Sequence, residues 1–175
     1  MEVTLRGLRY HPDMTEETPC FSASLYIDGK RRGTVSNNGQ GGAHRFGEWT
    51  AQRELDEWGK KQTPPVDAEE VVSARLDEML LAKDRKDTAK RLMRRMRPEA
   101  RRKQQHAPAG AAVLIVVGFR LDAKELTAVG ILAVRNCVVE KAKQVLAQRD
   151  GATAFDVFNC EGALIESTGE LRRAS

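Results

Sequence analysis

The stretch that decides the fold is Phe21-Ser-Ala-Ser-Leu-Tyr-Ile-Asp-Gly-Lys-Arg-Arg-Gly-Thr-Val-Ser36. Apolar and polar residues alternate in its first half, which places Phe21, Leu25 and Ile27 on one face of a strand. Asp28-Gly29 then matches a type I′ turn, because both central residues of that turn need positive φ. We therefore predict a β-hairpin centred on Asp28-Gly29, with its apolar face turned to a core.

The sequence on either side predicts a strand before the hairpin and helices after it. Residues 2–10 alternate in the same way and predict a half-buried strand. Thr50 is placed to cap a helix that reaches about residue 61. Asp67 and Glu70 form a capping-box pattern for a second helix, whose apolar stripe ends at Pro98. Residues 99–110 are polar and predict a connector.

The C-terminal part predicts strands on both sides of one helix. Residues 111–119 are apolar on both faces, which is typical of a covered strand. A further strand is expected over 126–133, a helix over 134–150, and a final hairpin over 154–166. Strands and helices fall in separate blocks, which favours an α+β fold with a mostly antiparallel sheet from the N- and C-terminal hairpins. The long helix or helix pair would lie in the middle.

Length and composition set limits on the class of protein. A chain of 175 residues favours one domain, here with sub-parts 1–49, 50–105 and 111–166. No apolar run is long enough to cross a membrane and no secretory signal is visible, so we expect a soluble, cytoplasmic protein without membrane contact. The three cysteines are widely spaced, which fits reduced thiols.

A cluster of basic residues is the strongest functional signal. Residues 83–103 hold eleven Lys or Arg against three acids, although the whole chain carries a formal net charge of only +4. Such a segment attracts phosphate or an acidic protein. We predict a surface for nucleic acid, or for an acidic or nucleic-acid-handling host protein, formed by Lys83, Lys86, Lys90, Arg91, Arg94, Arg95, Arg97, Arg101, Arg102 and Lys103. A solvated face with no partner is the alternative.

A glycine-rich loop is the second candidate site. The residues in question are Asn37, Gly39, Gly41, Gly42 and His44. Glycines let backbone amides surround an anion, but the spacing matches neither of the common phosphate-binding motifs. A plain connection, a binding loop, and a catalytic loop that uses His44 all stay open. No metal-ligand spacing and no cofactor motif is present, so we expect no metal and no cofactor.

Residues 15–45 also carry a family resemblance. The block Cys20-Phe-Ser-Ala-Ser-Leu-Tyr-Ile-Asp-Gly-Lys30 and the following Asn-Asn-Gly-Gln-Gly-Gly loop resemble the opening of small proteins of bacteriophages and other mobile elements. The resemblance implies an accessory gene of a phage or plasmid and a bacterial host. It implies no catalytic residue.

These observations favour binding over catalysis. The first interpretation is a non-enzymatic phage or mobile-element protein that contacts nucleic acid, or that inhibits a nucleic-acid-handling host defence protein, through its basic helix. The second is a small metal-dependent hydrolase or nuclease that uses the glycine loop and His44. The third is a structural or oligomeric accessory protein, and a homo-oligomer is left open.

Overall fold

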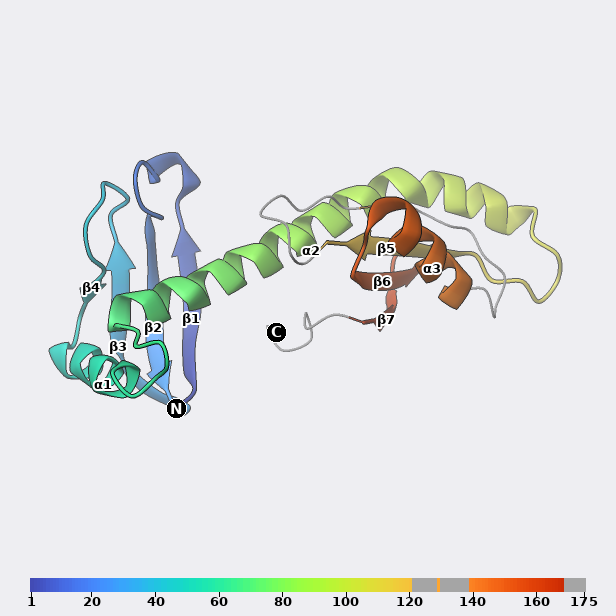
Figure 1. The fold of residues 1–175 in the computed structure, drawn as a ribbon. Coiled ribbons are helices and arrows are strands. Elements are labelled where there is room, and N and C mark those ends of the chain that lie inside the picture. The colour runs from blue at the N-terminus through green and yellow to red at the C-terminus, as the bar shows by residue number, and fades with distance from the viewer. Residues whose placement is uncertain (121–128, 130–138, 169–175) are drawn as a thin grey trace. The chain divides into compact units, whose positions relative to one another are not determined.

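The structure is a computed structural model that describes residues 1–120, 129 and 139–168. The chain divides into two compact units, Met1–Glu78 and Met79–Ser175, where length alone favoured one domain. Each unit has its own antiparallel sheet (Figure 1). The α+β class is therefore confirmed, with the N- and C-terminal hairpins in separate sheets.

The first unit is built on a four-stranded antiparallel sheet in the order β1-β2-β3-β4. Its strands are β1 (Val3–Tyr10), β2 (Phe21–Ile27), β3 (Lys30–Asn37) and β4 (Arg45–Phe46). A short 3-10 helix, η1 (Pro12–Met14), follows β1. The predicted hairpin is confirmed, since β2 and β3 pair around Asp28 and Gly29 with φ values of 48° and 75°.

The helices of the first unit cover one face of this sheet (Figure 1). They are α1 (Trp49–Gly59) and the first turns of α2 (Ala68–Gln105). Leu25, Ile27, Leu55 and Val72 are fully buried, as the alternation in β2 predicts. Burying each such side chain contributes roughly 1.5–3 kcal/mol relative to leaving it exposed.

The two helix starts differ from each other. The capping box is confirmed: Glu70 N–H donates to Asp67 Oδ1 at 2.8 Å, and Asp67 N–H donates to Glu70 Oε2 at 3.0 Å. The predicted Thr50 cap is wrong, because the N-cap of α1 is Glu48 and its side chain makes no capping bond. Glu48 instead packs beside Gly33, where an added Cβ would lie 2.8 Å from its Cγ.

Helix α2 continues beyond the predicted end. It passes through Pro98 and ends at Gln105, so residues 99–105 are helical and not a connector. Proline lacks the N–H that would bond to the carbonyl four residues earlier, which usually ends or kinks a helix. Met96 and Ala100 are buried on either side of Pro98. Their packing against the second sheet offsets the missing hydrogen bond.

The second unit has three strands sandwiched between helices. Its sheet has the order β5-β6-β7, with β5 (Leu114–Phe119), β6 (Ala154–Asn159) and β7 (Leu164–Ser167). Odd-numbered residues of β5 pack against α2, and Val116 packs against α3 (Val139–Asp150). The prediction of a strand covered on both faces is confirmed, as are the final hairpin and the C-terminal part of the predicted helix.

Two predictions fall on residues that the structure does not describe. The strand expected over 126–133 lies outside the described residues except for Val129, which forms a single bridge to Gly118. The first part of the helix expected over 134–150 also lies outside them.

Lys143 of α3 contacts β7, because its Nζ lies 2.6 Å from a carboxylate oxygen of Glu166.

Candidate functional site

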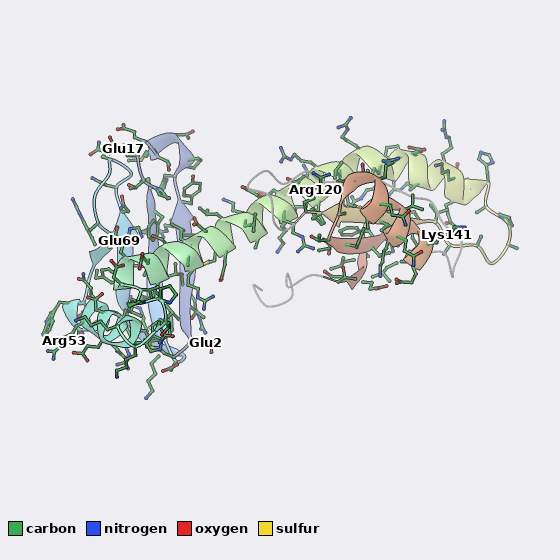
Figure 2. The ribbon with its side chains drawn as sticks, viewed as in Figure 1. Glu2, Glu17, Arg53, Glu69, Arg120 and Lys141 are labelled. Atoms are coloured by element: carbon green, nitrogen blue, oxygen red, sulfur yellow. The ribbon has the colours of Figure 1, made fainter. Side chains whose placement is uncertain are left out.

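The basic helix is docked along one face in the second unit. Ala89, Met93, Met96 and Ala100 recur at helical spacing and are buried against β5. These methionines are covered by the chain's own sheet, so they do not form a free seam for a partner. The opposite face of the helix is turned to solvent, and Figure 2 shows side chains standing out from it.

The exposed face carries nearly all of the predicted cations. Exposed residues are Lys83, Lys86, Lys90, Arg91, Arg94, Arg95, Arg101, Arg102 and Lys103. Two of them are paired on the helix itself: Lys90 lies 3.8 Å from Asp87, and Lys103 lies 3.0 Å from Glu99. Exposed pairs of this kind contribute little and leave the cations accessible.

The central arginines of this face have no ion-pair partner among the described residues. Arg95 and Arg102 line an open hollow together with Pro98 and Glu99. Arg91 donates to the hydroxyl of Thr88 at 3.1 Å, which holds its guanidinium close to the helix. A guanidinium offers several donors in one plane and matches a phosphate or carboxylate in two places.

Arg97 and Arg85 behave differently from these surface cations. The Arg97 guanidinium packs over Gly162 in the β6–β7 turn, and its Nε is buried without a hydrogen-bond partner in the described part of the chain. We therefore exclude Arg97 from the accessible surface. Arg85 is buried, with its guanidinium carbon 4.6 Å from the centre of the Phe119 ring and its Nη2 3.8 Å from Asp156.

The glycine loop is held together by Asn37. Its Oδ1 accepts from the Gly39 N–H at 2.9 Å and from the Thr18 hydroxyl at 2.8 Å, and its Nδ2 donates to the Gly42 carbonyl at 3.1 Å. The Gly39 carbonyl in turn accepts backbone N–H groups of residues 16–18. An added Cβ at Gly39 would overlap the Met14 carbonyl, so a close approach requires glycine there.

His44 closes this loop onto α2 with both ring nitrogens occupied. Nδ1 lies 3.2 Å from Asn37 Nδ2, and Nε2 lies 2.9 Å from Ser73 Oγ. Backbone groups fix the Asn37 amide orientation, so its Nδ2 donates and Nδ1 of His44 must accept. Nε2 therefore carries the proton and donates to Ser73. Burial lowers the pKa of His44, and Glu69 and Asp67 oppose that shift.

This arrangement is unsuited to general-base chemistry at His44. A base that activates Ser73 would need an unprotonated Nε2, but in this network the proton sits on that atom. The described residues also contain no group of three or more His, Cys, Asp or Glu side chains that could hold a metal ion. Cys20 is buried and lies beside Gly39, and His11 and His106 are exposed.

The comparisons with known proteins add no relative. No family model, curated protein or solved structure matches the chain. Within the described residues, no helix is both long enough and apolar enough to cross a membrane.

Two contributors to these sites were not predicted. Ser73 lies in α2 before the basic residues 83–103, and nothing local marks it as the partner of His44. Arg85 was counted with the basic residues, yet it sits four residues before Ala89 on the buried stripe of α2. That spacing was the available signal that Arg85 points inward.

Proposed function

We propose that this chain binds nucleic acid through the outward face of α2 between Lys83 and Lys103, and that it is not an enzyme. One observation carries the proposal. Nine exposed cations share a helix whose other face is docked on its own sheet, so they have no large intramolecular acidic surface in the described part of the second unit. Neutralising backbone phosphates releases condensed counterions, which favours binding by such a row of charges.

The arginines in the second half of this face are the expected core of the contact. Arg94 and Arg102 are about 12 Å apart along the axis, at 1.5 Å per residue. That length spans several phosphates of a duplex, which carries one charge per about 1.7 Å. The absence of Trp, Tyr and Phe from residues 83–103 argues against stacking on single strands.

The proposal includes a phage or mobile-element origin, and an acidic host protein as the second candidate partner. The resemblance of residues 15–45 supports a phage or mobile-element protein in the cytoplasm of a bacterial host. An acidic, nucleic-acid-handling host protein would meet the same guanidinium groups with carboxylates. The hydrolase alternative draws no support from His44, whose lone pair and proton are both engaged within the protein.

The test is a fluorescence-anisotropy titration with labelled duplex DNA, single-stranded DNA and RNA at two salt concentrations. The variant is Arg94→Gln/Arg101→Gln/Arg102→Gln, because glutamine removes the charge and keeps a good helix former. We expect the slope of log K against log salt to fall by about 2–3, since each phosphate contact contributes about 0.9 to the slope for a duplex.

The matched control removes three exposed lysines elsewhere, as Lys60→Gln/Lys61→Gln/Lys141→Gln. It changes the net charge equally, so general electrostatics would weaken both variants alike. Equal losses in the two variants would contradict a defined α2 interface. No binding of any nucleic acid at low salt would contradict the proposal itself and would direct the search to an acidic protein.

A further inference from the structure

The face of the first sheet that points away from α1 and α2 has an unusual side-chain arrangement. Strand pairing aligns Arg9 with Ser22, Ser22 with Ser36, and Ser36 with Arg45. Residues paired across an antiparallel sheet share a face, so these four form one row across all four strands. The row has an arginine at each end and two serine hydroxyls between them.

Two parallel rows repeat this chemistry. Pairing aligns Arg6 with Ser24 and Thr34 in one row, and Thr4 with Tyr26 and Arg31 in the next. Arg9 shares the face of Arg6 because the register shifts between them, at a Gly7 with φ of 65°. We call the surface made by these three rows the open sheet face.

The open sheet face is strongly positive. Arg6, Arg9, Arg31 and Arg45 are all exposed, and none has an ion-pair partner among the described residues. Arg32, which the bulge in β3 places out of register, reaches the helix side instead and pairs with Glu54 at 3.2 Å. None of the three rows contains an acid, and Glu2 lies just before the first residue of β1 (Figure 2).

We propose that the open sheet face is a second nucleic-acid surface, and that it docks across a groove of duplex DNA on the phosphates at its two sides. Three strand spacings of about 4.8 Å separate Arg9 from Arg45, giving about 14 Å at the backbone. The major groove of B-DNA is about 12 Å wide. The sheet is therefore too wide to enter the groove, and the two arginines meet phosphates on its two sides, where contacts fix the position of the protein without reading the bases.

A duplex fits this face better than a single strand does. Single-strand surfaces present free aromatic rings on which bases stack. The three rows contain one aromatic ring, Tyr26, and the guanidinium carbon of Arg6 lies 4.4 Å from its centre. That ring is covered by a cation of the protein itself, so the face offers charge and hydroxyl groups but no open stacking platform.

The inference rests on the proposed nucleic-acid function, yet it has its own test in the full-length protein. The variant Arg9→Gln/Arg31→Gln/Arg45→Gln removes three exposed charges and spares Arg6, which packs on Tyr26. We expect duplex DNA affinity to fall at least tenfold at moderate salt and the salt slope to fall by about 2–3. The Lys60→Gln/Lys61→Gln/Lys141→Gln variant is again the control.

A second variant tests whether the contact is to phosphates. Ser22→Ala/Ser36→Ala keeps every charge, so duplex affinity and the salt slope should change little. In a selection from random duplexes, the wild-type protein and Arg9→Gln/Arg31→Gln/Arg45→Gln should enrich the same base pairs, because phosphate contacts carry no sequence information. A base-pair preference that is lost in the arginine variant would overturn docking on the phosphates.

The outcomes separate the two proposals. If the sheet variant binds like its control while the α2 variant loses affinity, the open sheet face is overturned and the proposed function stands. If only the sheet variant loses affinity, the sheet is the interface and the α2 surface is overturned. Single-stranded DNA or duplex RNA bound more tightly than duplex DNA, or no binding at all, would overturn the inference.

Discussion

Nε2 of His44 lies 2.9 Å from Oγ of Ser73, which is 29 residues further along the chain. This bond ties the end of the glycine loop to the second turn of α2. The His44 ring also packs at right angles to the ring of Phe21 of β2, with ring centres 5.2 Å apart. A histidine that links a loop, a strand and a helix of the same unit acts as a structural residue, and only its neutral form fits this network.

His44 should make the first unit sensitive to acid. Burial lowers its pKa from 6.5, so the unfolded chain takes up the proton first as the pH falls. The contribution of His44 to the free energy of unfolding should therefore be fully present above about pH 6.5. It should decrease as the pH falls from there to the pKa of His44 in the folded protein. Urea unfolding at several pH values, followed by tryptophan fluorescence, measures this, because both tryptophans lie in the first unit.

The variant His44→Gln should lose this part of the pH dependence, whereas His106→Gln, at an exposed position, should keep it. Contributions from carboxylates cancel when the variants are compared at each pH. An identical pH profile for His44→Gln and the wild type would show that the shift at His44 has no energetic consequence.

Asn37 is buried and holds the glycine loop together, whereas its neighbour Asn38 is exposed. Asn37→Asp places a carboxylate against the Gly42 carbonyl and removes the donor to His44, so unfolding should become easier by about 2–4 kcal/mol. The new charge beside Nδ1 should also raise the pKa of His44, which an NMR titration measures. Asn38→Asp, at an exposed site whose bonds to Gln40 are both 3.4 Å long, should change either quantity little. Similar effects at both sites would contradict this network.

Local signals explain what the sequence predicted well. Asp28-Gly29 and the Asp67–Glu70 box act within a few residues, so their turn and cap follow from short-range geometry alone. The covered strand β5 was also predictable, because apolar residues fill both of its faces. The separation into two sheets was not, since nothing in the two hairpins indicates whether their edges pair with each other.

Surface and buried cations could not be separated by counting charges. Arg97 lies only two residues after Arg95, but it packs on Gly162 in the β6–β7 turn. The open sheet face was hidden for a similar reason. Which residues belong to this face depends on the register shift after Arg6 and on the two-residue strand β4. Neither feature produces an alternation of apolar and polar residues in the sequence.

Arg97 and Gly162 should be energetically coupled. An added Cβ at Gly162 would overlap the Arg97 guanidinium, and its φ of 94° disfavours any side chain. Gly162→Ala should therefore cost more than Gly110→Ala, whose φ of 82° is similar but which has open space around it. Both substitutions place a side chain at positive φ, which costs about 1 kcal/mol at each position. At Gly162 the added methyl group must also displace the end of the flexible Arg97 side chain, which should add up to about 1 kcal/mol.

A double-mutant cycle isolates this coupling. Combining Gly162→Ala with Arg97→Ala should remove the additional cost, because the group that clashes is gone. Native-state hydrogen exchange of the β5 amides measures the stability of the second unit. Strict additivity of the two substitutions would contradict the contact.

Arg85 and Asp156 form the ion pair with the lowest side-chain exposure among the described residues, 4% for each. Asp156 also accepts the Ser167 hydroxyl at 2.6 Å, whereas Nε and Nη2 of Arg85 have no hydrogen-bond partner there. Burial lowers the pKa of Arg85, and Asp156 opposes that shift. The carboxylate is therefore the main compensation for a buried charge that is poorly hydrogen-bonded.

Asp156→Asn removes that compensation while keeping an acceptor for Ser167, and it should destabilise the second unit by about 3–5 kcal/mol. Asp156→Asn combined with Arg85→Met should recover most of this loss, because no unpaired charge then stays in the core. Asp150→Asn, which breaks the more exposed pair with Arg149, should cost less than about 1 kcal/mol. If hydrogen exchange of β5 finds the double variant as unstable as Asp156→Asn alone, the uncompensated charge of Arg85 is not the cause of the loss in Asp156→Asn.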